Sequence, residues 1–399
     1  MRVTLASLGG GTPETVTVEC AAALESAACI LGAPRLLERL PSGCTRNRVA
    51  AVRPEELLAA ILEQSGDCAV VYSGDAGFYS GARGLLPLLR EKNIPAEMLP
   101  GISSVQMLSA RLGRPWQDWE LVSAHGTECD VLGAVTQGKP AFFLTGGVLG
   151  PGEICGRLTE GGLGGLPVTV GENLSRPGER IVSGTAEELA GRSFVSLSVL
   201  LAEAAPHGPR RCPGFPDGAF LRGEVPMTKQ EVRAAALAKL AVRPEDVLWD
   251  VGAGTGSVSV EMALAAWRGK VFAVECGGEA CGLIRANREK FHAWNLRIAE
   301  GRAPEALAEL PPPDAVFIGG TKGGMEEILS SVLEKNEKAR VCISAIAVET
   351  LSAALAALEK HGIAAQVTQI AVSRSRPAGK LHLLTANNPI FLITGNCDD

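Results

Sequence analysis

A strand that runs into alternating glycines constrains this chain more than any other feature. The apolar run at residues 247–251 contains Asp250 and leads into Gly252, Gly254 and Gly256, just where a helix is expected to begin. Glycine allows the backbone to approach a ligand closely, and the unpaired N–H groups of a helix N-terminus attract it. The segment therefore predicts a nucleoside site in a strand–loop–helix unit.

The glycine spacing distinguishes between nucleosides. A dinucleotide fingerprint reads G-x-G-x-x-G, and this chain has Ser257 where that pattern needs its third glycine. The spacing D-x-G-x-G-x-G points instead to S-adenosylmethionine. The next predicted strand, 271–275, ends in Glu275 about 20 residues further on, where a carboxylate can accept hydrogen bonds from ribose hydroxyls.

A second set of glycine-rich turns occupies the first half of the chain. They lie at 7–14, 73–78, 100–104, 145–147 and 171–175, most of them directly after a predicted strand. A single turn of this kind is typical of a helix entry. Their order and spacing together indicate a second cofactor site.

These turns carry a family resemblance. The loop at 7–11, S-G-D-x-G-F at 73–78 and P-G-I-S-S at 100–104 resemble the tetrapyrrole methylase family, whereas 215–229, the Asp250 motif and 373–377 resemble the cobalamin-pathway C15 methyltransferases and decarboxylases. Together the two resemblances cover nearly all 399 residues. Ser7 and Gly10 replace the first glycine and the proline of the usual G-x-G-P-G, which predicts a more flexible first loop.

The resemblance implies an α/β fold with two domains and is the main support for S-adenosylmethionine as the ligand. Residues 1–205 would form a two-lobed tetrapyrrole methylase-like domain that methylates C5 of a precorrin. Residues 212–399 would form a doubly wound Rossmann-like methyltransferase domain that methylates C15 and releases a ring acetate as CO₂. The expected contacts to two bound S-adenosylmethionine molecules are Gly9, Gly11, Asp75, Gly77, Ser103, Ser104 and Thr145 in the first domain, and Thr228, Asp250, Gly252, Gly254, Gly256, Glu275 and Gly301 in the second.

Methyl transfer from a sulfonium needs alignment rather than a nucleophilic residue. Arg374 and Arg376 are candidates to hold the carboxylate that leaves as CO₂, although their run also fits a solvated edge loop. His125 is a candidate proton shuttle or, equally, a structural hydrogen-bonding residue. No metal is expected, because the eleven cysteines form no C-x-x-C pair.

Charge and hydropathy limit the kinds of partner and substrate that this chain can bind. The chain has 38 Lys and Arg against 44 Asp and Glu, with the net charge of −6 confined to residues 1–208. This balance disfavours a nucleic-acid substrate and allows a small polycarboxylate, a tetrapyrrole. No apolar run approaches the roughly 20 residues that span a bilayer, and the N-terminus lacks a signal peptide pattern. We therefore expect a cytoplasmic protein without membrane contact. A homo-oligomer is a separate expectation.

The Pro- and Gly-rich stretch at 204–216 predicts a linker between two βα-alternating halves. Predicted strands are 28–31, 68–72, 95–99, 120–123, 140–144, 168–172 and 194–200 before it, and 247–251, 271–275, 296–299, 314–318 and 340–345 after it. The segments 365–373, 380–385 and 390–394 should close the second sheet with an antiparallel edge, and Thr228 should begin a capping box with Glu231. Two alternatives stay open: a nucleic-acid methyltransferase, and a chain in which one half only binds a ligand or a second copy.

Overall fold

The computed structural model describes residues 1–40, 43–147, 149–206, 213–321 and 323–397. They divide into two compact units, Met1–Val135 with Lys139–Ala204 and Thr136–Gly138 with Ala205–Asp399. Part of the predicted linker, at 207–212, lies outside the described residues.

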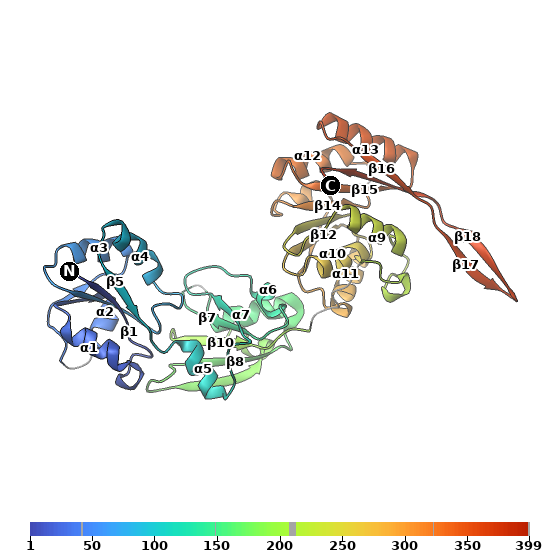
Figure 1. Cartoon of the computed structure of the whole chain (residues 1–399). Helices are drawn as coiled ribbons and strands as arrows, with labels where there is room; N and C mark the ends of the chain where they lie inside the picture. The colour runs from blue at the N-terminus through green and yellow to red at the C-terminus, as the bar shows by residue number, and fades with distance from the viewer. Residues whose placement is uncertain (41–42, 148, 207–212, 322, 398–399) are drawn as a thin grey trace. The chain divides into compact units, whose positions relative to one another are not determined.

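The first lobe of the N-terminal unit is a parallel sheet of five strands in the order β3-β2-β4-β1-β5 (Figure 1). The strands are β1 (Val3–Ser7), β2 (Cys29–Gly32), β3 (Arg48–Ala50), β4 (Cys68–Tyr72) and β5 (Ala96–Leu99). Val3 and Leu5 pack with α3 (Pro54–Leu62) and α4 (Ala82–Glu91), whereas Ala6 packs on the other face with α1 (Val18–Ser26) and α2 (Pro34–Leu37). Because successive side chains of a strand point to opposite faces, a run of apolar residues fills both layers.

The second lobe is a mixed sheet in the order β6-β7-β10-β8-β9. Its strands are β6 (Glu120–Ser123), β7 (Ala141–Leu144), β8 (Pro167–Glu172), β9 (Arg180–Thr185) and β10 (Ser198–Ala202), and its helices are α5 (Ser104–Leu112), α6 (Val131–Val135), α7 (Pro151–Leu158) and α8 (Ala186–Leu189). Only β6 and β7 pair in parallel. The two sheets confirm the predicted two-lobed α/β architecture.

The C-terminal unit contains a seven-stranded sheet in the order β13-β12-β11-β14-β15-β19-β16. Its parallel strands are β11 (Val247–Val251), β12 (Lys270–Glu275), β13 (Leu296–Glu300), β14 (Ala315–Ile318) and β15 (Arg340–Ala345), and β19 (Ile390–Gly395) lies antiparallel between β15 and β16 (Gln366–Ile370). One face packs against α9 (Gln230–Lys239), α10 (Ser257–Ala265) and α11 (Gly278–Lys290), and the other against α12 (Met325–Lys335) and α13 (Val348–Lys360). This is the predicted doubly wound fold, with the chain order reversing beside β11.

The predicted closing edge is wrong in part. Segment 365–373 was expected to be one strand, but it contains all of β16 and the first residue of β17 (Ser373–Ala378). Among the described strands, β17 pairs with β18 (Leu381–Ala386) alone. These two strands form a ribbon that extends away from the seven-stranded sheet (Figure 1). Only β16 and β19 supply the antiparallel edge.

The start of α9 also differs from the prediction. Its N-cap residue is Lys229 rather than Thr228, and the Lys229 side chain does not cap the helix. Asp217 does so instead, because its Oδ1 accepts the Gln230 N–H at 2.8 Å. A carboxylate from outside the helix thus replaces the predicted capping box.

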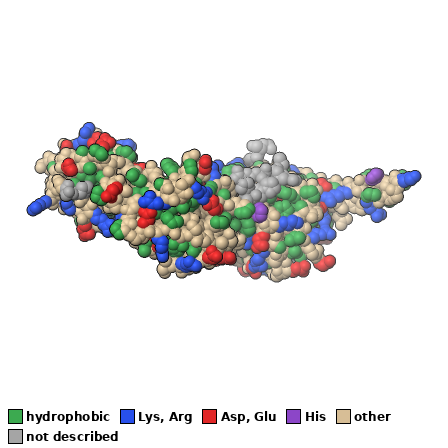
Figure 2. All heavy atoms as spheres, turned by 90° about the horizontal axis from the view of Figure 1, so that it is seen from below, with side chains coloured by type: hydrophobic (Ala, Val, Ile, Leu, Met, Phe, Trp, Pro, Cys, Tyr) green, Lys and Arg blue, Asp and Glu red, His purple; other side chains and the backbone are tan. Residues whose placement is uncertain are grey.

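Two surface features bear on partners. On the face in Figure 2, Lys and Arg side chains are interspersed with Asp and Glu over most of the described surface. Within the described ranges, no helix has the length and apolar character to cross a membrane.

Candidate active sites

The N-terminal unit holds a cavity of about 370 Å³ between its two lobes. Loops after β1 and β4 and the start of α5 form one side, and the loops after β6, β7 and β8 with the start of β10 form the other. Ser7 pairs with Tyr72, and Ala6 with Leu99, so three glycine-rich turns meet at the carboxyl ends of adjacent parallel strands. The turns on which the sequence predicts a site therefore surround one cavity, and their ligand contacts stay a prediction.

Most of the residues predicted for this site line the cavity. They are Gly9, Asp75, Ser103, Ser104, Thr145 and His125. Gly11 and Gly77 do not line it. Gly11 has a φ of 82° and packs against the Arg176 guanidinium, and the Gly77 N–H donates to Asp75 Oδ1 at 2.9 Å. These two glycines shape the loops rather than the cavity wall.

Ser7, one of the two departures from the usual first-loop pattern, has a structural role of its own. Its buried Oγ donates to the Leu99 carbonyl at 2.6 Å and accepts the Ala76 N–H at 2.9 Å. One hydroxyl therefore joins the ends of β1 and β5 to the turn after β4. A Cβ on Gly101 would collide with the Ser7 side chain and lie 2.5 Å from the Gly74 carbonyl oxygen, so the turn after β5 also depends on this packing.

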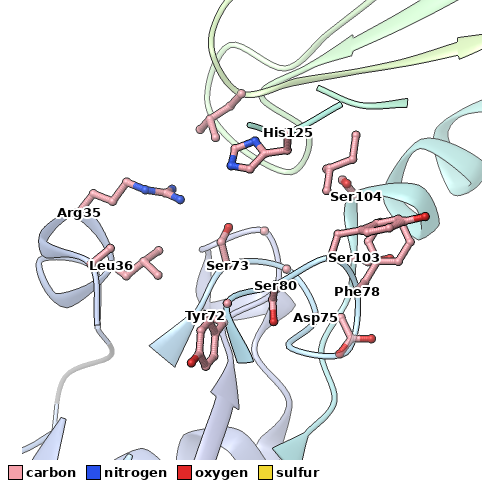
Figure 3. A pocket seen from close by; sticks show the side chains of 18 of the residues that line it. Arg35, Leu36, Tyr72, Ser73, Asp75, Phe78, Ser80, Ser103, Ser104 and His125 are labelled. Atoms are coloured by element: carbon pink, nitrogen blue, oxygen red, sulfur yellow. The ribbon is translucent and has the colours of Figure 1, made fainter. Parts of the chain in front are cut away.

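Several polar side chains at the cavity are already engaged. Thr145 Oγ1 donates to the Ser198 carbonyl at 2.6 Å, and Gln106 Oε1 accepts the Ser103 N–H at 2.8 Å, which caps α5. The Asp75 carboxylate points away from the open space in Figure 3 and closes its own turn. These residues fix the backbone that lines the cavity.

The His125 ring projects into the cavity from the second lobe (Figure 3). Its Nδ1 lies 3.2 Å from the Thr145 carbonyl oxygen. A carbonyl only accepts, so this contact assigns the proton to Nδ1 and leaves Nε2 as an acceptor. The ring can therefore orient a donor group or take up a proton at Nε2.

The C-terminal unit holds a larger cavity, of about 710 Å³, at the carboxyl ends of β11, β12 and β14. Of the predicted contacts, Thr228, Gly252, Gly254, Glu275 and Gly301 line it, and Asp250 and Gly256 do not. This is the edge of a doubly wound sheet where ligands usually bind.

The glycine loop needs left-handed backbone at all three positions. Gly252, Gly254 and Gly256 have φ values of 74°, 56° and 75°. A Cβ on Gly252 would lie 2.6 Å from the Gly320 carbonyl oxygen, and one on Gly256 would lie 3.0 Å from Ile284 Cγ1. Gly254 faces the cavity, where a Cβ would lie 3.0 Å from the Pro226 carbonyl oxygen. Side chains here would be strained, and at Gly254 they would also occupy ligand space.

Glu275 holds this loop in place. Its Oε2 accepts the Gly254 N–H at 2.9 Å, and its Oε1 accepts the N–H groups of Cys276 and Gly277 at 2.8 and 2.9 Å. The carboxylate is half-buried and lines the cavity, so its remaining lone pairs can accept hydroxyl donors from a ligand.

Asp250 lies beneath the loop rather than in the cavity. Its side chain is buried, its Oδ2 accepts a hydrogen bond from Ser259 Oγ, and its Oδ1 has no hydrogen-bond partner among the described residues. Burial raises the pKa of this carboxyl to about 7, with a smaller upward contribution from Glu275, against the bonds from Ser259. Asp250 is therefore placed to support the loop.

The predicted arginines lie on the ribbon. Arg374 pairs with Asp217 at 3.0 Å and with Glu231 at 2.5 Å, and neither Arg374 nor Arg376 lines the cavity. The cations that do line it are Lys229 and Arg302. Across the described residues, no group of three or more His, Cys, Asp and Glu side chains could hold a metal ion.

Sequence reasoning missed several lining residues. They include Arg35, Tyr72, Asn173, Arg176 and Ser198 in the first cavity, and Lys229, Thr321, Ser344, Asn387 and Asn388 in the second. Lys229 adjoins the predicted Thr228, and Tyr72 and Asn173 adjoin glycine turns, so position next to a motif was the available signal. Arg35, Asn387 and Asn388 lie next to no predicted motif, so the sequence carried no such signal for them.

Comparison with known proteins agrees with this geometry. Residues 2–190 match the family described as tetrapyrrole (corrin/porphyrin) methylases, and residues 219–395 match the precorrin methyltransferase domain. The chain is 31% identical over 363 residues to the precorrin-6Y C(5,15)-methyltransferase (decarboxylating) of Sinorhizobium sp., covering 89% of this chain and 87% of that protein. It is 46% identical over 191 residues to the probable cobalt-precorrin-6B C(15)-methyltransferase (decarboxylating) of Pyrobaculum calidifontis, covering 47% of this chain and 97% of that protein. A crystal structure of precorrin-6y C5,15-methyltransferase from Geobacter metallireducens shares 37% identity over 47% of this chain and 97% of that one, with a TM-score of 0.45.

Proposed function

This chain belongs to the family of decarboxylating precorrin-6Y C(5,15)-methyltransferases, and we propose that it methylates a precorrin at C5 and C15 and removes a ring acetate as CO₂ in cobalamin synthesis. One observation carries the proposal. Each unit has its own glycine-lined cavity at the carboxyl ends of parallel strands, so the chain has a separate place for each methyl transfer.

Two features of the C-terminal cavity suit S-adenosylmethionine. Gly252 and Gly254 bring the backbone to the cavity wall without side chains, and the Glu275 carboxylate can accept hydrogen bonds from ribose hydroxyls. When bound, this group supplies an electrophilic methyl on a sulfonium. We place a second molecule in the N-terminal cavity, which Gly9 and the start of α5 line, and a helix start offers backbone N–H groups that lack partners within the helix.

The chain's own contribution to methyl transfer is alignment and exclusion of water. Holding two reactants in line can lower a barrier by about 7–11 kcal/mol, which explains why rigid loops rather than a catalytic triad form these sites. Ser7 and Glu275 keep the two loops in place. His125 Nε2 is positioned to hold or accept a proton in the first cavity.

We assign C5 to the N-terminal unit and C15 with CO₂ release to the C-terminal unit. The support is that a relative named for the C(15) reaction matches only 47% of this chain, about the size of the precorrin methyltransferase domain at 219–395. In decarboxylation, the C–C electron pair of the acetate arm enters the conjugated ring, CO₂ leaves, and the remaining methylene carbon takes up a proton. Arg374 and Arg376 stay predicted contributors, and Lys229 is a further candidate because it lines the cavity and can orient the arm.

Product analysis of two variants tests this assignment. Gly101→Val crowds the turn held by Ser7, and Gly254→Val fills ligand space in the other unit. With isotope-labelled donor, the first product should carry one new methyl and lack the acetate carboxyl, and the second should lack the C15 methyl and retain the carboxyl. A first variant that delivers both methyls, or a second that releases CO₂, would refute the assignment. Titration of each variant with S-adenosylhomocysteine also tests whether one half is only a binding module, since such a half would show no donor site.

The other expected properties are part of the proposal. The interspersed charges support a small-molecule substrate over a nucleic acid. A homo-oligomer is supported by the ribbon, on which Leu381, Leu383 and Leu384 are 68%, 46% and 76% exposed. We propose that a second copy covers these leucines, and sedimentation of Leu381→Ser with Leu384→Ser should show a smaller assembly than the unmodified chain. The cytoplasmic location and the absence of a metal stay predictions.

A further inference from the structure

The rim of the N-terminal cavity carries a group of arginines that methyl transfer itself does not need. Arg35 lies on α2, Arg39 follows the C-cap of that helix, and Arg176 lies in the loop after β8. Arg35 and Arg176 line the same cavity from different lobes. Arg39 does not line it but is close enough for its charge to act on Arg176. The guanidinium of Arg35 extends into the open space, across from the loop that carries His125 (Figure 3).

Arg176 is fixed on the first glycine loop. Its Nε donates to the Gly10 carbonyl at 2.5 Å, and a Cβ on Gly11 would collide with its Nη2. The absence of a side chain at residue 11 therefore gives the guanidinium its place. Burial, followed by the charges of Arg39 and Arg35, lowers the pKa of Arg176, as expected where like charges converge.

None of these three arginines has an acidic partner among the described residues. The arginines of this unit that form described ion pairs are Arg2, Arg53, Arg111, Arg114, Arg157 and Arg180. Residues 1–208 carry a net charge of −6, so carboxylates are abundant in this half of the chain. Asp75 also lines the cavity, but its carboxylate accepts the Gly77 N–H and points away from the open space. Like charges gathered at a cavity without a carboxylate in contact indicate that the counter-charge comes with the ligand.

We propose that Arg35, Arg39 and Arg176 form a carboxylate-binding rim that grips the acidic side arms of the ring substrate above the C5 methyl-transfer site. The inference rests on the proposed function, which supplies a ring with several acetate and propionate arms. Guanidinium groups suit this role because they bind carboxylates through two parallel hydrogen bonds. Three cations also outnumber the single carboxylate of the methyl donor, which favours the ring as the source of the anions.

The rim should act on the substrate's affinity and leave the methyl-transfer step unchanged. Arg35→Gln and Arg39→Gln carry the test, because both side chains are exposed, whereas Arg176 also supports the glycine loop. Each should raise KM of the full chain for the precorrin in C5 methylation by about tenfold, the effect of one lost charge-assisted hydrogen bond. The kcat for C5 methylation, KM for S-adenosylmethionine, and C15 methylation with CO₂ release should stay as in the unmodified chain. Added salt should raise KM of the unmodified chain more than that of the Arg35→Gln, Arg39→Gln double variant.

Arg83→Gln is the matched control. It removes the same charge from an exposed position on α4 that does not line the cavity, and it should leave every rate unchanged. If Arg35→Gln and Arg39→Gln behave like Arg83→Gln, the rim is refuted while the proposed function stands. A rise in KM for S-adenosylmethionine alone would assign the arginines to the donor's carboxylate and overturn the proposal. An unmodified chain that transfers no methyl to the precorrin would refute the proposed function itself.

Discussion

Replacing Asp250 by asparagine should remove a pH dependence from the stability of the C-terminal unit. The carboxyl is buried at the end of β11, where Ser259 donates to one oxygen and no described group donates to the other. Burial is the largest cause that raises its pKa to about 7. The folded unit therefore keeps a proton here that the unfolded chain has lost at the same pH.

The sign follows from this difference. In the unfolded chain the carboxyl has the ordinary aspartate pKa of about 3.9. In the folded unit its pKa is about 7. Between these values the native state binds one more proton, so the free energy of unfolding falls as pH rises. A difference of about three pKa units corresponds to a loss of about 4 kcal/mol, complete once the pH exceeds the folded pKa. The stabilisation is fully present only below the unfolded pKa.

Hydrogen exchange in urea measures the free energy of unfolding of this unit, read from peptides of β11 and α10. The measurement is made at about pH 5, 6, 7 and 8, in steps of about one unit across the transition. Asp250→Asn should flatten the fall with pH. Relative to the protonated carboxyl, its unpaired amide N–H should cost about 1–3 kcal/mol, so the variant should be the less stable chain at low pH. At about pH 8, where the unmodified chain has lost about 4 kcal/mol, the variant should be the more stable one. Glu359→Gln, which changes an exposed acid on α13, should keep the slope. Equal slopes in Asp250→Asn and the unmodified chain would show that the carboxyl ionises normally and would refute the reasoning.

Three further changes test the loops and the ribbon. Glu275→Ala should weaken S-adenosylhomocysteine binding to the C-terminal unit by about 1.5–3 kcal/mol, the scale of hydrogen bonds to a charged group, and normal binding by calorimetry would contradict the assignment. Ser7→Ala should lower the unfolding free energy of the N-terminal unit by about 1–3 kcal/mol, since the Ala76 N–H loses its buried acceptor; urea unfolding measures this, and an unchanged midpoint would contradict it. Arg374→Ala should slow CO₂ release more than it weakens donor binding, whereas Glu231→Gln, which breaks the same ion pair, should leave CO₂ release unchanged. If Arg374→Ala and the unmodified chain release CO₂ at the same rate, the role of Arg374 is limited to its ion pairs with Asp217 and Glu231.

Much of the fold could be predicted because buried parallel strands are apolar runs that end at glycine turns. β4 and β11 start and end where the sequence predicted. The missed strands β3 and β9 lie at sheet edges and contain no fully buried residue, so they lack the hydrophobic pattern on which the prediction depends. The break between β16 and β17 is set by pairing with β19 and β18, which a local pattern does not encode.

The sites were predictable in place and less so in their members. Glycines that line a cavity and glycines that only shape its loop look alike in sequence, as Gly254 and Gly256 show. Asp250 was expected to touch the ligand and instead lies buried beneath the loop. Arg35 and Arg176 meet only through tertiary packing, 141 positions apart in the numbering of the chain.

The two units stabilise their glycine loops by different means, with different consequences. In the N-terminal unit, the Ser7 hydroxyl is fully buried behind the turns it joins, so it does not line the cavity. In the C-terminal unit, the Glu275 carboxylate both holds the Gly254 N–H and faces the cavity. Loop order and donor binding therefore depend on the same oxygens in the second unit and on separate groups in the first. A change at Glu275 must affect both properties together, whereas a change at Ser7 acts on the ligand only through the loop.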